Sequence, residues 1–122
     1  MKMAIASTGE SLDSQVDPRF GRCHWLILAD TDDMSFEALK NRAAAAGHGA
    51  GVEAAQMVAN MGCRGVVAST FGPNAAHALA QGGLAMYRFS GGTVREAIEA
   101  VKAGTLEQLN GANAAAHSGD RE

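Results

Sequence analysis

The second half of the chain alternates short strands with short helices, and this alternation restricts the fold more than any other feature. Residues 65–70, GVVAST, and residues 84–89, LAMYRF, are apolar runs typical of buried strands. Between them, the segment GPNAAHALAQG has Pro73 where a first helical turn begins and Gly82 where the helix ends. A strand, a short helix and a second strand form a parallel pair with a right-handed crossover. The pattern predicts an α/β fold.

Two further helices flank this unit. From Ala50, small and apolar residues recur at helical spacing until Gly62, which is a stop signal. Thr93 is followed three residues later by Glu96, the pattern of a capping box, and Gly104 ends the helix that this box opens. Such a cap contributes about 1 kcal/mol.

The first half of the chain predicts three strands. Residues 2–7, KMAIAS, and 24–30, HWLILAD, are apolar on both faces, as buried strands are, whereas 36–40, FEALK, carries charges and fits an edge strand after a hairpin. We therefore predict a five-stranded mixed sheet in the order 3-2-1-4-5, in which strand 2 alone is antiparallel. Ribonuclease H has a similar sheet, but KMAIAS lacks the acidic residues that would hold magnesium for nuclease chemistry.

Composition sets outer limits on the function. A chain of 122 residues fits one domain, and we expect it to span residues 1–109 with a disordered tail at 110–122, which has no large apolar residue. The net charge of -3 argues against nucleic acid or anionic membrane as partners. No segment reaches the ~18 apolar residues of a membrane span, and we expect no signal peptide. With two cysteines, a reducing cytoplasm is the expected compartment.

Four motif-like segments are expected at one edge of the sheet. In the predicted order the first and fourth strands form a topological switch point, where open α/β sheets bind ligands. The segments that reach this edge are DPRFGRC (17–23), GHGAG (47–51), GPNA (72–75) and SGGT (90–93). The last three precede helices, whose free N–H groups favour an anion, and we expect serine and threonine hydroxyls to form the floor of the site.

These segments supply the candidate anion-binding residues. They are Arg19, Arg22, Gly47, Gly49, Gly51, Asn74, Ser90 and Thr93. The glycines have an alternative interpretation, since they also let the chain turn into a helix. The two arginines have one as well, which is salt bridging to Asp13 or Asp17.

Cys23 is the most reactive candidate. Cys23 lies between Arg22 and His24 and close to Arg19, and these cations predict a lowered thiol pKa and a thiolate, which with His24 and His48 would give metal ligands. A structural cysteine is an equal alternative, and a nucleophile would need a general base that spacing does not identify. One cysteine at this edge means that a cluster would be preassembled, shared by two chains, or completed by the histidines. Cys63 lies at the opposite edge, too far for a disulfide, and is expected to be structural.

The motifs together resemble a known family. KMAIAST, DPRFGRC, GHGAGVEAAQ, GPNA and SGGTVREAIEAVKAG occur in this order over about residues 1–109. They resemble the dinitrogenase iron-molybdenum cofactor biosynthesis family, the NifX-like small proteins. The resemblance implies a ribonuclease H-like three-layer α/β/α fold and no catalysis. It also implies, for some members, binding or carriage of an iron-sulfur or iron-molybdenum cluster precursor in nitrogenase maturation.

The leading hypothesis is therefore a non-enzymatic protein that binds such a cluster transiently and exchanges it with donor and acceptor proteins. The alternative is a metal-free domain that binds a small anion or metabolite through the glycine-rich loops. A thiol-dependent enzyme is a third and weaker hypothesis. A homodimer is left open.

Overall fold

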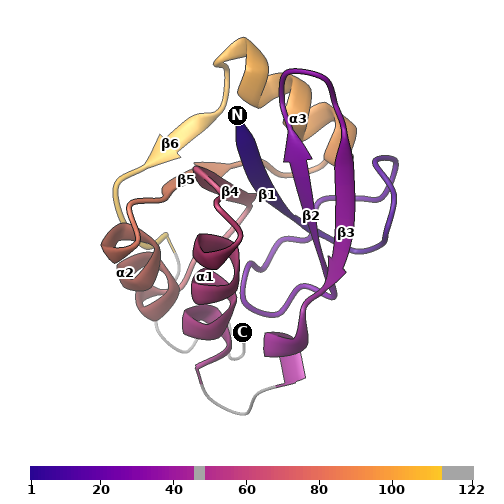
Figure 1. Ribbon diagram of the computed structural model, residues 1–122. Coiled ribbons are helices and arrows are strands. Elements are labelled where there is room, and N and C mark those ends of the chain that lie inside the picture. The colour runs from indigo at the N-terminus through magenta and orange to yellow at the C-terminus, as the bar shows by residue number, and fades with distance from the viewer. Residues whose placement is uncertain (46–48, 114–122) are drawn as a thin grey trace.

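The computed structural model describes residues 1–45 and 49–113, and its central feature is one mixed sheet (Figure 1). Within these residues, none of the helices is long and apolar enough to cross a membrane. The elements in chain order are β1 (Lys2–Ser7), β2 (Trp25–Asp30), β3 (Phe36–Lys40), the 3-10 helix η1 (Arg42–Ala45), α1 (Ala50–Asn60), β4 (Gly65–Ala68), α2 (Pro73–Gln81), β5 (Ala85–Arg88), α3 (Val94–Ala103) and β6 (Glu107–Leu109).

The strands follow the order β3-β2-β1-β4-β5-β6. β1 pairs antiparallel with β2 and parallel with β4, and β4 pairs parallel with β5. The predicted order of five strands with an antiparallel second strand is confirmed. β6 adds a sixth strand that pairs antiparallel with β5. The sequence did not predict it because it has three residues, and Leu109 alone among them is partly buried.

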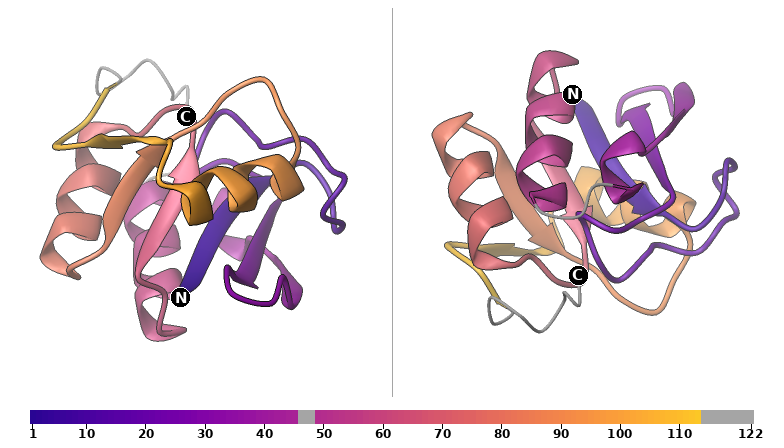
Figure 2. Two further views of the ribbon diagram at one scale, coloured as in Figure 1. Left: turned by 90° about the horizontal axis from the view of Figure 1, so that it is seen from above. Right: turned by 90° about the horizontal axis from the view of Figure 1, so that it is seen from below.

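Helices cover both faces of the sheet, giving the expected three layers (Figures 1 and 2). Alternate residues of β1 point to opposite faces: Ala4 and Ala6 join the core under α1 and α2, and Met3 and Ile5 join the core under α3. This alternation follows from the two-residue repeat of a strand. Both cores consist mainly of aliphatic side chains, as the low aromatic content predicts.

The boundaries of β2, β4 and β5 differ from the prediction by one or two residues, and the start of the tail differs as well. The second strand begins at Trp25 rather than at His24, which is exposed. The predicted tail begins at residue 110, yet the structure describes residues 110–113 and gives Asn113 hydrogen bonds to the loop after β4. Residues 114–122 lie outside the described residues.

Candidate functional site

The loops beyond the carboxyl ends of β1 and β4 lie at one end of the sheet, which is the lower end of the molecule in Figure 1. We call this end the rim and define it as residues 7–24, 49–52, 69–75 and 89–96. Isolated bridges join its segments: Ser7 pairs with Val16, Gln15 with Thr93, and Arg19 with Thr70. The predicted convergence of DPRFGRC, GPNA and SGGT is therefore observed, and the described part of GHGAG begins α1 there.

The hydroxyl groups of the rim are used within the protein. Ser7 Oγ donates to the carbonyl of Gly9 at 2.7 Å, and Ser69 Oγ donates to the carbonyl of Phe89 at 2.9 Å. Thr70 Oγ1 donates to the carbonyl of Pro18 at 2.9 Å. Each of these hydroxyls donates its proton to a loop carbonyl, and their role as the floor of a ligand site stays a prediction. These hydrogen bonds fix the loops.

The DPRFGRC loop is anchored at its start and in its middle. At its start, the buried Asp17 accepts a hydrogen bond from the backbone N–H of Arg19 at 3.0 Å, which closes an Asx turn. In its middle, Phe20 is 1 % exposed, and its ring centroid lies 5.7 Å from that of Phe71. This aromatic contact connects the loop to the segment that leads into α2.

Cys23 lies at the end of this loop and is fully buried. Its thiol donates to the carbonyl of Phe20 at 3.1 Å. Burial, followed by the charge of Asp17, raises the pKa of the thiol to about 12. The prediction of a lowered pKa and a thiolate is therefore wrong, because arginines that are close in sequence do not offset the cost of burying a charged sulfur. Cys23 and Cys63 are both buried, and they are unpaired, as predicted.

Asn41 organises the same loop, and the sequence analysis did not identify it. Its side chain is 3 % exposed and donates to the carbonyls of Gly21 at 3.2 Å and Cys23 at 2.9 Å. Its Oδ1 accepts from the N–H of Ala43 at 3.2 Å, at the start of η1. An asparagine directly after an edge strand is a weak turn signal, so only the fold shows that it holds the Cys23 loop against η1.

The predicted histidine ligands are not brought together with Cys23. The side chain of His24 is exposed, while its carbonyl accepts from the N–H of Asn41 at 2.9 Å. His48 and Gly47 lie outside the described residues. Among residues 1–45 and 49–113, no group of three or more His, Cys, Asp or Glu residues could hold a metal ion.

Two glycines of the rim serve close packing. A Cβ atom on Gly21 would lie 2.8 Å from Cα of Gly51, and a Cβ atom on Gly51 would lie 2.8 Å from Cβ of Ala75. The loop thus meets α1 backbone to backbone, and α1 meets α2 at the Cβ atom of Ala75. Gly49, the N-cap of α1, has a φ of 77°, which favours glycine. The alternative interpretation of these glycines, as residues needed for chain geometry, accounts for Gly49 and Gly51.

The three helix starts at the rim differ. α1 and α2 begin after Gly49 and Gly72 without a side-chain cap. Asn74 is exposed in the first turn of α2. In contrast, the predicted capping box of α3 is confirmed: Thr93 Oγ1 accepts from the N–H of Glu96, and the Glu96 carboxylate accepts from the N–H of Thr93. The anion site predicted at this third start is therefore occupied by the protein's own carboxylate.

Basic side chains lie on the α1 side of the rim. Arg22 donates to the carbonyl of Ala44 in η1 at 3.0 Å, and Arg19 is exposed. Asp13, one predicted partner of these arginines, lies 3.3 Å from Arg95 instead. A hollow of about 450 Å³ lies between η1 and α1, and Arg42 and Glu53 are among its lining residues. Arg42 lies in η1, the element whose Ala44 carbonyl accepts from Arg22, and spacing alone does not show this placement.

Ser90 completes the predicted set and is exposed in the segment that precedes α3. It lies on the side of the rim that the capping box closes. The residues that remain best placed for an anion are those beside the starts of α1 and α2.

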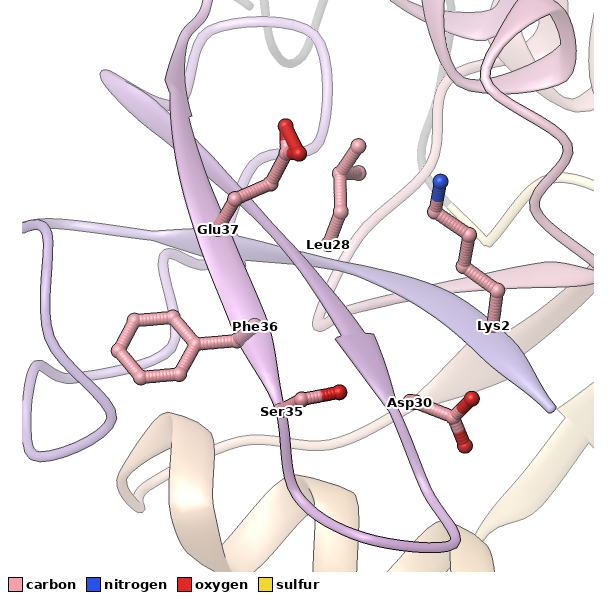
Figure 3. A pocket seen from close by; sticks show the side chains of 6 residues that line it. All are labelled: Lys2, Leu28, Asp30, Ser35, Phe36 and Glu37. Atoms are coloured by element: carbon pink, nitrogen blue, oxygen red, sulfur yellow. The ribbon is translucent and has the colours of Figure 1, made fainter.

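A second hollow, of about 310 Å³, lies at the opposite end of the sheet (Figure 3). Lys2, Leu28 and Glu37 point to one side there, and Phe36 points away. Its charges have partners: Lys2 Nζ donates to the carbonyl of Met61 at 2.9 Å, and Asp30 lies 3.2 Å from the N-terminal ammonium, whose pKa is raised by this hydrogen bond. This hollow offers no comparable anion site.

Comparisons with known proteins agree with the architecture. The apo form of the orange protein from Desulfovibrio gigas has a TM-score of 0.89 and 33 % identity, over 93 % of this chain and 96 % of that one. A putative NifB protein from Thermotoga has a TM-score of 0.78 and 40 % identity, over 88 % of this chain and 92 % of that one. The uncharacterized protein MJ0580 from Methanocaldococcus jannaschii is 27 % identical over 100 residues, which are 80 % of this chain and 85 % of that protein.

The model of one protein family, described as dinitrogenase iron-molybdenum cofactor, matches residues 1–104. The match includes every strand and helix that surrounds the rim. The chain belongs to the dinitrogenase iron-molybdenum cofactor family.

Proposed function

We propose that this chain binds an anionic iron-sulfur or iron-molybdenum cluster at the rim and carries it between a donor and an acceptor protein. The observation that carries this proposal is the pair of helix starts without side-chain caps, which lie beside the loop that bears Arg19 and Arg22. Free N–H groups and guanidinium groups both stabilise negative charge. The family supports the class of cargo.

The state of Cys23 suggests the order of events. A neutral, buried thiol does not attract a cluster, so capture begins with the cationic and N–H groups of the rim. Ligation by Cys23 is a second step, in which the loop opens, the thiol loses its proton to solvent and the sulfur binds a metal of the cluster. His24 is exposed and could complete the ligand set, and His48 is proposed for the same role on its place in the sequence.

We propose further that the chain is a carrier and not a catalyst. A thiol with a pKa of about 12 is a poor nucleophile at neutral pH. In the described ranges, Cys23 has hydrogen bonds to Phe20 and Asn41 and none to a histidine or carboxylate that could act as its base, and the nearby charge of Asp17 raises its pKa further. With two unpaired cysteines, the reducing cytoplasm is the proposed place of exchange.

The test is anaerobic binding of an isolated iron-molybdenum-sulfur cluster, followed by removal of free cluster and assay of retained metal. We expect stoichiometric retention by the wild type and by Cys63→Ala, and loss of retention in Cys23→Ala. Combined replacement of Arg19 and Arg22 by glutamine should slow capture, whereas Arg64→Gln, at the opposite end of β4, should not. Equal retention by both cysteine variants would reject Cys23 as a ligand, and no retention by the wild type would reject the carrier function.

The second candidate function is metal-free binding of a small anion or metabolite. The same helix starts favour it, because a phosphate needs N–H donors and no metal. A ligand that binds the native state raises the melting temperature. Stabilisation of metal-free protein by inorganic phosphate or a nucleotide, combined with no cluster retention, would favour this function over the carrier.

A further inference from the structure

The segment after α3 returns to the rim and holds two of its loops. β6 pairs with β5 at the edge of the sheet, so that Leu106 packs on the core under α3 and Leu109 on the core under α1 and α2 (Figure 1). The segment therefore crosses the sheet edge from one layer to the other. It lies beyond residues 1–104, which the family model matches. We call residues 105–113 the C-terminal arm.

Asn113 ends the described arm and clamps the loop after β4. Its Oδ1 accepts from the N–H of Phe71 at 2.8 Å, and its Nδ2 donates to the carbonyl of Ser69 at 2.8 Å. Its backbone N–H donates to the carbonyl of Phe71 at 3.2 Å. Three hydrogen bonds from Asn113 therefore hold the segment that leads into α2, at the carbonyl of Ser69 and at the N–H and carbonyl of Phe71.

The clamped loop in turn holds DPRFGRC. The ring of Phe71 packs against that of Phe20, and both side chains are 1 % exposed. The N–H of Phe20 donates to the carbonyl of Thr70 at 3.3 Å, and the N–H of Thr70 donates to the carbonyl of Pro18 at 2.7 Å. The carbonyl of Phe20 accepts the Cys23 thiol proton. A continuous set of contacts thus runs from Asn113 to the buried sulfur.

We infer that Asn113 is a positioning residue for the rim: it keeps the Phe20 loop closed over Cys23, and its release opens that loop. The arm is suited to this role because β6 has three residues, and the bonds that join Asn113 to the rim are few. Elements held by few bonds open at a lower free energy than the core. The opening itself is a property of the free protein, whereas its effect on cargo rests on the proposed function.

The consequence for cargo follows from the second step proposed above. Ligation by Cys23 needs the loop to open, so release of Asn113 makes the sulfur reachable and changes how fast the cluster is taken up or given away. The arm would then set the balance between a closed rim, in which the Cys23 sulfur is buried, and an open rim, in which it can ligate.

The experiment measures amide hydrogen exchange at Phe71, Thr70 and Phe20 in the full chain. Asn113→Ala removes the two side-chain hydrogen bonds of Asn113, each of which contributes about 1 kcal/mol. The exchange rate at all three amides should therefore rise by about tenfold to thirtyfold. Asn110→Ala is the matched control: Asn110 is exposed in the same arm, and its side chain has none of the bonds to the loop after β4 that Asn113 makes. It should leave these rates unchanged, and amides of β1 should be unaffected in both variants.

A second variant guards against general unfolding. Asn113→Asp keeps the acceptor for the N–H of Phe71 and loses the donor to Ser69, so we expect a smaller rise than in Asn113→Ala. In a Cys63→Ala background, the rate of Cys23 modification by a thiol reagent should rise in the same order as the exchange of Phe20.

Faster exchange at Phe71 with no change at Phe20 would overturn the inference, because Asn113 would then hold the loop after β4 without holding the Phe20 loop. Equal effects of Asn110→Ala and Asn113→Ala would also overturn it. Cluster uptake is measured separately: an open Phe20 loop with unchanged uptake kinetics would reject the link to cargo. If the wild type retains no cluster, the proposed function fails, and the exchange rates alone decide whether Asn113 positions the rim.

Discussion

The starts of the three helices at the rim differ in how their free N–H groups are satisfied. α3 begins with Thr93 and Glu96, which cap each other's backbone at 3.2 and 2.8 Å. α1 and α2 begin after glycines and have no side-chain cap. The most recognisable helix signal in the sequence therefore marks the start that is closed to a ligand. The two starts with weaker local signals are open to an anion.

The difference extends to the neighbouring side chains. The closed start carries the carboxylate of Glu96, which already interacts favourably with the helix dipole. The open starts adjoin the loop of Arg19 and Arg22, and the first turn of α1 also carries Glu53. The rim thus has an α3 side that is satisfied internally and an α1–α2 side with capacity to bind. Four predictions test this contrast.

The largest effect on stability is expected at the aromatic contact between Phe71 and Phe20, which joins the α1–α2 side of the rim to the DPRFGRC loop. Phe71→Ala removes a ring that is 1 % exposed and packs on Phe20, so the free energy of unfolding should fall by about 3–5 kcal/mol. Phe89, which is half-buried on the α3 side, is the matched control, and Phe89→Ala should cost less. Denaturant unfolding measures both variants. Equal losses would show that the aromatic contact gives the open side no special stability.

The next effect concerns pH and the buried thiol of that side. Burial raises the pKa of Cys23 to about 12, so the native thiol keeps its proton at pH values where the unfolded thiol has lost it. This contribution to stability is complete below the unfolded pKa of about 8.5 and is lost as pH rises toward 12, by up to about 1.4 kcal/mol per pH unit. Cys23→Ala should show a shallower loss of stability above pH 9. An unchanged slope would contradict the burial of a neutral thiol.

The closed side is tested by removing its cap. Thr93→Ala should lower the free energy of unfolding by about 1 kcal/mol, because the N–H of Glu96 loses its acceptor. Thr105→Ala, at the other end of α3, is the control, since Thr105 has an exposed hydrogen bond of 3.3 Å to Ala100. Thermal and denaturant unfolding report the loss. A large loss of cluster retention in Thr93→Ala would show that the α3 start takes part in binding.

The smallest effect on stability is expected for a charge added at the start of α2. This charge should stabilise the fold and weaken anion binding. Asn74→Asp adds a negative charge to the exposed first turn of α2, which should stabilise the protein by about 0.3–1 kcal/mol and weaken binding of an anion by about two- to fivefold. Asn60→Asp adds the same charge at the last turn of α1, where it should destabilise slightly and leave binding unchanged. Tighter anion binding by Asn74→Asp would contradict an anion site at this start.

The fold could be predicted from the sequence because its signals are local. Apolar runs gave β1, β2 and β4, and Thr93 with Glu96 gave the start of α3. β6 was missed because a three-residue strand with one partly buried side chain has no detectable pattern. Its place depends on pairing with β5, which is a long-range contact.

The chemistry of the site was less predictable for a related reason. The pKa of Cys23 was predicted from neighbouring arginines, but burial decides it, and burial depends on Phe20 and Asn41. The hydroxyls of Ser7 and Thr70 were placed correctly at the rim, yet their bonds to loop carbonyls depend on the path of the chain. Sequence shows which groups reach the rim and does not show which of them are already satisfied.

The most direct measurement is an anaerobic titration of an isolated iron-molybdenum-sulfur cluster into the wild type, Asn74→Asp and Thr93→Ala, with retained iron and molybdenum as the readout. A rim that binds at its open helix starts predicts stoichiometric binding by the wild type, weaker binding by Asn74→Asp and unchanged binding by Thr93→Ala. No binding by the wild type, or equal weakening in the two variants, would contradict it.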